Sequence, residues 1–232
     1  MGLGIEPDWP GIDPAQDPDA ARRVAFRIPG ALTSVESRPG RERGYHIDLD
    51  PILDDPVECD RVVQWYVHKL SAFSIKEPAR APELLAVIDK AKNRARGDTV
   101  GVLRLAGAIS IAFKRPHLII DMSKDEPAAR LKSRAPAELG VPAAERFAGY
   151  NVALVTDHCT TGSEALDALE TIEGNGGTVT IFLAYTIIGS EFRRKDFEAK
   201  GVTVKHFLSA PEDLRLIGLR VSELERLGLS VS

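Results

Sequence analysis

Apolar and polar residues occur in alternating blocks along the second half of the chain, and these blocks predict strands and helices in turn. Continuous apolar runs predict buried strands at 117–121, 151–157, 177–187 and 202–208. Helical spacing of apolar residues predicts helices at 163–172 and 190–200, and a glycine follows each helix. Strands that alternate with helices favour an α/β fold with a parallel sheet flanked by helices.

The first half of the chain gives a less regular pattern. Residues 56–70 predict a helix. Its apolar face carries Val62, Tyr66 and Leu70. Residues 82–96 predict a second helix, because Pro82 lies near its start, apolar residues repeat at helical spacing, and Gly97 follows.

The remaining segments complete the predicted organisation. Residues 98–105 predict a strand, and residues 106–113 predict a short helix after it. Residues 122–148 are rich in Pro, Ala, Lys and Arg and predict a loop. Residues 1–44 are rich in Pro, Asp, Arg and Gly and predict an extended or partly disordered arm.

Composition narrows the function classes. The 232 residues are 44% hydrophobic, enough for a sizeable core, and the net charge of -4 gives no general electrostatic case for nucleic acid or anionic membranes. No apolar run approaches the roughly 18 residues of a membrane span, and the acidic, Pro-rich start is unlike a secretory signal. Cys59 and Cys159 are too far apart for a metal knuckle. We therefore expect a protein of the reducing cytoplasm.

The segment with the most chemical information follows the predicted strand at 151–157. Asp157 ends the strand, and His158, Cys159, Thr160, Thr161, Gly162 and Ser163 lead into the next helix. The first N–H groups of a helix and the positive end of its dipole bind anions, and hydroxyls add donors. Gly162 lets the backbone approach a ligand closely. Because Asp157 can accept hydrogen bonds from sugar hydroxyls, this turn is suited to a sugar phosphate.

This turn resembles the ribose-phosphate loop of the type I phosphoribosyltransferases. In that loop an apolar strand leads to two acidic residues, two variable residues and Thr-Thr-Gly-Ser, and the chain matches this order over Val152–Ser163 except at Thr156. Within the family, the orotate phosphoribosyltransferases are most similar. Residues 101–112 resemble their pyrophosphate strand and turn, 122–125 the start of their mobile catalytic loop, and 201–214 their last strand.

The resemblance implies a fold, a domain division and a cofactor. It implies one phosphoribosyltransferase-like domain over 45–232, with a helical hood region at 45–97 that covers the carboxyl edge of the sheet and an α/β core at 98–232. It also implies a homodimer, and Mg²⁺ held mainly by the substrate's diphosphate and not by protein ligands. His158 and Cys159 occupy variable positions of the turn, and no third metal ligand is close to them in the sequence.

The implied reaction is a pentosyl transfer of pyrimidine nucleotide synthesis. A nitrogen of a base, orotate in the most similar class, displaces pyrophosphate from C1 of 5-phosphoribosyl 1-diphosphate (PRPP). Asp157 would hold the ribose, and the turn from His158 to Ser163 would hold the 5'-phosphate. Lys124 would neutralise the leaving pyrophosphate, and the resemblance implies that it acts across the interface of a dimer. Arg104 and the backbone N–H groups of Ala106 and Gly107 would contact the diphosphate.

Several positions depart from the family pattern. Thr156 replaces one acid of the usual pair, and Ile120-Asp121 stand where the family has Arg-Lys. Glu126-Pro127 replace the histidine and glycine that follow the loop lysine, and Pro127 stiffens a loop that must close. Further cations of the loop are candidates to supply the missing charge. They are Arg130, Lys132 and Arg134.

Three functions therefore remain open. The first is the transferase, with orotate or a different base. The second is a regulatory module that binds PRPP or a nucleotide without turnover, and the third is an assembly subunit. Restoring Arg-Lys at Ile120-Asp121 is the experiment that the sequence suggests to separate the first two.

Overall fold

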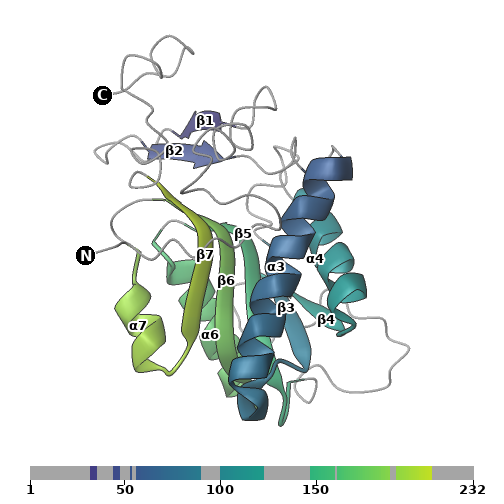
Figure 1. Cartoon of the computed structure of the whole chain (residues 1–232). Helices are drawn as coiled ribbons and strands as arrows, with labels where there is room; N and C mark the ends of the chain where they lie inside the picture. Colours follow the sequence, from purple (N-terminus) through teal and green to yellow (C-terminus); the bar gives the residue numbers. More distant parts are fainter. Residues whose placement is uncertain are drawn as a thin grey trace, which may run out of the picture.

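A sheet of five parallel strands forms the centre of the molecule (Figure 1). The computed structural model describes residues 32–35, 44–47, 53, 56–89, 100–122, 147–159, 161–188 and 192–210. In spatial order the strands are β4 (His117–Asp121), β3 (Leu84–Asp89), β5 (Asn151–Cys159), β6 (Thr178–Ile188) and β7 (Thr203–Ala210). The parallel α/β sheet predicted from the alternating blocks is confirmed.

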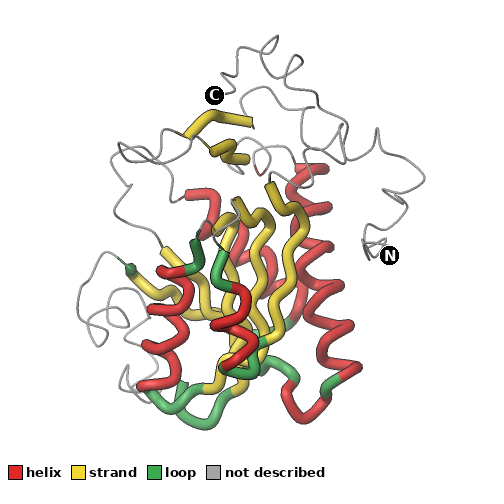
Figure 2. Tube along the Cα trace, turned by 90° about the vertical axis from the view of Figure 1, so that its left-hand side faces the viewer, coloured by secondary structure: helices red, strands yellow, loops and turns green. Residues whose placement is uncertain are grey.

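Helices cover both faces of this sheet (Figures 1 and 2). One face carries α3 (Pro56–Lys76) and α4 (Val100–Phe113), and the other carries α6 (Ser163–Gly174) and α7 (Arg194–Ala199). Successive strand residues point to opposite faces. In β5, for example, Ala153 and Val155 pack with α3 and α4, while Val152 and Leu154 pack with α6 and α7. The side chains of each continuous apolar run therefore contribute to two hydrophobic cores, one on each face of the sheet.

Helix α3 confirms the prediction for 56–70 and extends it to Lys76. Its predicted apolar face is buried, since Val62, Tyr66 and Leu70 are at most 1% exposed. After α3, the 3₁₀ helix η1 (Pro78–Arg80) leads into the sheet. Arg80 holds this entrance in place: its guanidinium donates to the carbonyl oxygens of Thr180, at 3.3 Å, and of Gly201.

The helix predicted at 82–96 is wrong. Residues Leu84–Asp89 form β3, which pairs with β4 on one side and β5 on the other. Every residue from Leu84 to Ile88 is at most 5% exposed. Leu84 and Ile88 fit a helical stripe, but the residues between them are equally apolar because the strand is buried on both faces.

The strand predicted at 98–105 is wrong from Val100 onward, and 101–112 do not form the strand and turn that the resemblance implied. The short helix predicted at 106–113 is confirmed as the second part of a longer helix. Residues Val100–Phe113 form the single helix α4, whose Leu105 and Ile109 are buried against the sheet. The domain division moves with this correction, because the sheet already begins at Leu84, inside the region assigned to the hood.

Two short strands belong to the N-terminal region. β1 (Leu32–Val35) lies within the predicted arm and pairs antiparallel with β2 (Gly44–Ile47). In both views this pair lies over the carboxyl ends of the parallel strands, the position that the resemblance implies for a hood (Figures 1 and 2). Gly44, the last residue of the arm, begins β2, and the remaining residues of the arm lie outside the described residues.

The strand order places a switch point at the centre of the sheet. The chain moves from β3 outward to β4 and then returns to β5, from which β6 and β7 extend the sheet in the opposite direction. In an open parallel sheet, ligands bind at the carboxyl ends of the strands where the order reverses. A ligand is therefore expected at the carboxyl ends of β3 and β5.

Candidate active site

The predicted sugar-phosphate turn lies at this switch point. β5 ends at Cys159, Gly162 is the N-cap of α6, and the helix begins at Ser163. The N-cap residue Gly162 has no side chain that could cap the helix, and the Thr161 hydroxyl accepts from the backbone N–H of Ser163 at a long 3.4 Å. A helix start of this kind offers backbone N–H groups to an anion. Thr161 and Ser163 add hydroxyls, with their oxygens 3.1 Å apart. Thr160 lies outside the described residues.

Gly162 is needed at this turn for two reasons. Its φ of +86° lies in the left-handed region, where residues with a side chain are strained. A Cβ atom here would also lie 3.0 Å from a ring carbon of Phe192 and 3.2 Å from one of Phe197. The turn therefore rests directly on the aromatic side chains that follow β6.

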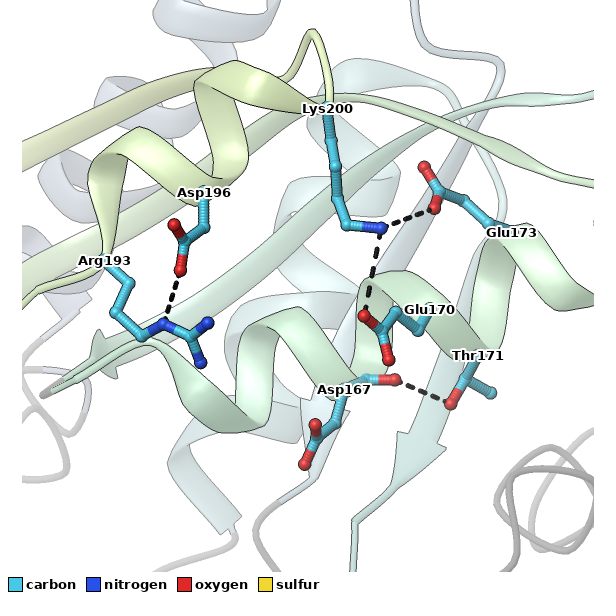
Figure 3. Close-up of polar contacts among 7 residues, drawn as sticks. All are labelled: Asp167, Glu170, Thr171, Glu173, Arg193, Asp196 and Lys200. Atoms are coloured by element: carbon cyan, nitrogen blue, oxygen red, sulfur yellow. Dashed lines mark hydrogen bonds and ion pairs between the residues drawn. The ribbon is translucent and has the colours of Figure 1, made fainter.

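The segment before α7 contacts the turn and helps to hold it in place. The backbone N–H of Arg193 donates to the carbonyl oxygen of Thr161 at 3.0 Å, and the Arg193 side chain is held by Asp196 (Figure 3). Lys200, just after α7, reaches Glu173 of α6 at 3.3 Å (Figure 3). Since these ion pairs are at the surface, they add little stability. The burial of Phe197 against Phe182, with centroids 4.9 Å apart, fixes α7 more firmly.

Asp157 projects near the end of β5, and its carboxylate has a defined orientation. Its Oδ1 atom accepts from the backbone N–H of His158 at 2.6 Å and from the Thr156 hydroxyl at 3.2 Å. The ring Nδ1 of His158 is also 3.2 Å from this oxygen. The Asp157 side chain is 17% exposed, so a ligand at the strand end can reach a carboxylate that is already oriented.

Thr156 has a structural task that the sequence pattern did not reveal. Its side chain is 1% exposed and donates toward Asp157 and toward the carbonyl oxygen of His158 at 3.2 Å. It therefore does not replace the missing acid as a ribose contact. It orients the acid that remains.

Some of the predicted site residues are not placed for the contacts predicted for them. Cys159 is 5% exposed and packs among the core residues under α6, so its thiol does not line a phosphate cradle. Arg104, Ala106 and Gly107 lie on α4, not on a turn. The N–H groups of Ala106 and Gly107 come after the first four residues of the helix and serve its internal hydrogen bonds. The predicted backbone contacts to a diphosphate are therefore wrong.

The start of the predicted catalytic loop is altered as well. Ile120 is fully buried in the core beneath α6 and α7, which means that an arginine at 120 would place a charge in an apolar core. Restoring Arg-Lys at 120–121 is therefore not a usable test of function. The loop positions lie outside the described residues. They are Lys124, Glu126, Pro127, Arg130, Lys132 and Arg134.

The sequence prediction missed one pair of acids. The backbone register places Asp89 opposite Asp121 at the carboxyl ends of β3 and β4, beside the switch point. The helix predicted for 82–96 hid this, because only the strand assignment brings Asp89 to that edge. Within the described ranges, no three His, Cys, Asp or Glu residues are grouped so that they could hold a metal ion. Nor does any helix there have the length and apolarity to cross a membrane.

Known proteins share this fold. No family model matches the chain. The orotate phosphoribosyltransferase of Methanothermobacter thermautotrophicus is 26% identical over 174 residues, which are 75% of this chain and 80% of that protein. The structure of the orotate phosphoribosyltransferase from Aeropyrum pernix superposes with a TM-score of 0.54 at 17% identity, and covers 91% of this chain and 98% of that one. The chain has the fold of the type I phosphoribosyltransferases. The resemblance found in the sequence is confirmed.

The type I fold alone does not select a base. The adenine phosphoribosyltransferase of Leishmania donovani superposes with the same TM-score of 0.54 at 17% identity, over 82% of this chain and 81% of that one. Orotate is named by the sequence relative and not selected by the fold. The adenine enzyme shows that this fold occurs in proteins named for different bases.

Proposed function

We propose that this protein transfers a 5-phosphoribosyl group from PRPP to a nitrogen of a nucleobase, with orotate as the first candidate, and releases pyrophosphate. The carrying observation is the glycine turn at Gly162, which leads into the first turn of α6 at the switch point of the sheet, with Asp157 oriented beside it. The named activity of the sequence relative supports orotate.

Each part of the site has one task in this proposal. The first turn of α6 binds the 5'-phosphate through its backbone N–H groups, and the hydroxyls of Thr161 and Ser163 add further hydrogen-bond donors. Asp157 accepts hydrogen bonds from the ribose hydroxyls and so fixes the orientation of C1. His158 holds the Asp157 carboxylate through its backbone N–H.

Mg²⁺ enters with the diphosphate as part of the substrate and offsets its negative charge. Lys124, which follows the end of β4 at Asp121, is the proposed cation for the leaving group. Arg104, exposed on α4, is kept as a second candidate for this task. We further propose that the protein is a homodimer, and analytical ultracentrifugation measures its oligomeric state directly. We also propose a cytoplasmic location.

The test is pyrophosphate release from PRPP and Mg²⁺ by the full chain, with orotate and then a panel of other bases. Orotate-dependent release, reduced at least about tenfold in Asp157→Asn, is the result we expect. Thr180→Val is the control, because Thr180 lies near the opposite end of β6 from the turn. Release with another base alone would reassign the substrate, and no release with any base would reject transfer.

A second function is favoured by two observations. Ile120 is buried where the related pattern has a cation, and Thr156 leaves a single acid at the ribose position. Both features suit a protein that binds PRPP or a nucleotide and regulates a partner without turnover. Calorimetric binding of PRPP by a chain that releases no pyrophosphate would favour this function over transfer.

A further inference from the structure

The hydroxyl of Tyr66 connects helix α3 to the peptide bond before Asp157. It donates to the carbonyl oxygen of Thr156 at 2.7 Å, over a separation of 90 residues. Tyr66 is fully buried, and its ring is fixed by an edge contact to Trp65 at 4.7 Å between centroids and by stacking on Tyr185 at 6.5 Å. The donor therefore has a single defined position.

This hydrogen bond falls where β5 loses a neighbour. Pairing between β3 and β5 ends at Val155, whereas pairing between β5 and β6 continues to Cys159. From Thr156 onward the strand that carries the site is paired on one side only. Tyr66 supplies a contact from α3 at the first residue beyond the β3 pairing.

Fixing this carbonyl also fixes Asp157. The peptide group is planar, so the carbonyl of Thr156 and the N–H of Asp157 move as one unit. The Asp157 carboxylate is in turn held by the Thr156 hydroxyl and the His158 N–H. A change at the Thr156 carbonyl would therefore tilt the whole acceptor group toward or away from a bound ribose.

The hydroxyl keeps its proton under all ordinary conditions. Burial raises the pKa of Tyr66 well above its usual value near 10, and the charge of Asp157 raises it further. A backbone hydrogen bond from Tyr185 acts in the opposite direction and is the weaker effect. Tyr66 thus remains a donor across the pH range in which the protein would be assayed.

We propose that Tyr66 is a positioning residue for Asp157 and sets the affinity of the site for ribose hydroxyls, but not for phosphate. The inference rests on the proposed function, since it assigns the ribose to Asp157. The phosphate turn at 161–163 lies beyond the reach of this contact, because it is supported by Gly162 and the segment before α7.

The experiment compares two ligands by calorimetry on the full chain. For Tyr66→Phe we expect ribose 5-phosphate to bind about 3- to 10-fold more weakly, the loss expected for one hydrogen bond, and inorganic phosphate to bind within about twofold of the wild type. The kinetic counterpart is a raised KM for PRPP with little change in kcat, at every pH from about 6 to 9. Equal losses for both ligands, or no loss for ribose 5-phosphate, would overturn the proposal.

A double-mutant cycle separates positioning from a general loss of stability. In an Asp157→Asn background, Tyr66→Phe should cause no further loss of ribose 5-phosphate affinity, because the group it orients has gone. Additive losses would contradict the assignment. If the wild type itself fails to bind ribose 5-phosphate, the proposed function falls with it. If the wild type binds and Tyr66→Phe binds equally well, only the role of Tyr66 falls.

Discussion

At the scale of single residues, the site depends on the small size of the residues at positions 162 and 156. Gly162 has no Cβ, and so the turn can lie against Phe192 with a left-handed φ. Thr156 is shorter than an acid, and its hydroxyl turns inward to Asp157. The sequence predicted that Gly162 would let the backbone approach a ligand, but not that the turn would pack against aromatic side chains, because these come from a distant segment. The inward hydroxyl was equally hidden, since it depends on the burial of Thr156.

Thr156→Val tests the inward hydroxyl. It removes the donor to Asp157 but keeps the shape of the side chain, so we expect a loss of about 1 kcal/mol in the free energy of unfolding and weaker binding of ribose 5-phosphate. Urea unfolding and calorimetry measure the two effects.

Thr180→Val is the matched control for this substitution. Thr180 is 1% exposed and lies at a register irregularity of β6, and its hydroxyl has no hydrogen-bond partner among the described residues. Replacing an unpaired buried hydroxyl by a methyl group should leave stability unchanged or raise it. Equal destabilisation by the two substitutions would show that the Thr156 hydrogen bonds contribute nothing.

Gly162→Ala tests the phosphate turn. The left-handed φ costs roughly 1–2 kcal/mol for a residue with a Cβ. The contacts at 3.0 Å and 3.2 Å with Phe192 and Phe197 add to this cost and shift the turn. We expect inorganic phosphate to bind at least about tenfold more weakly, as measured by calorimetry.

Gly201→Ala isolates the backbone part of that effect. Gly201 has a φ of +75°, but a Cβ there would meet no atom within 4 Å. It should therefore show the cost of the left-handed backbone without loss of phosphate binding. Equal phosphate affinity in the two variants would contradict the placement of the anion at Gly162.

At the scale of elements, the sequence predicted the second half of the fold better than the first. The strand runs after residue 116 and the helices between them are flanked by clear stops, and every one of them is present. β3 was missed because a strand buried on both faces has no alternation, and so Leu84 and Ile88 also satisfy a helical spacing. The sequence analysis therefore placed a helix at the residues of β3 and a strand at the first residues of α4.

The contact between α7 and β7 makes a prediction about pH. His206 of β7 lies 3.1 Å from Arg194 of α7, and burial together with the neighbouring charges of Arg194, Lys205 and Lys69 lowers its pKa from 6.5 to about 4. Between these two values the unfolded chain binds a proton that the folded chain does not. The contribution of His206 is therefore fully present above about pH 6.5 and is lost as the pH falls toward 4.

Urea unfolding of wild type and His206→Gln at a series of pH values measures this contribution. The difference between the two should change with pH between about 6.5 and 4, with the wild type losing more stability in acid. Burial also lowers the pKa of His117, but this acts equally in both proteins and cancels in the difference. Parallel curves for the two proteins would show that His206 does not titrate as the structure requires.

At the scale of the whole molecule, the strand order of the sheet determines where an anion can bind, and the net charge does not. The chain carries -4 overall, yet the switch point presents a helix start and hydroxyls to an anion. The sequence could predict the turn from Asp157 to Ser163 because its residues are contiguous. It could not predict the support from Tyr66 and Phe192, nor Asp89 at the same edge, because only the folded sheet brings them there.

The most direct test of the central claim is a titration of isotope-labelled protein with ribose 5-phosphate, followed by backbone amide chemical shifts. We predict saturable shifts concentrated at the end of β5 and the first turn of α6, from Asp157 to Leu166, and no comparable change at the start of β6 around Thr180. Shifts that avoid the turn, or no saturable shifts at millimolar ligand, would show that this turn is not a phosphoribosyl site.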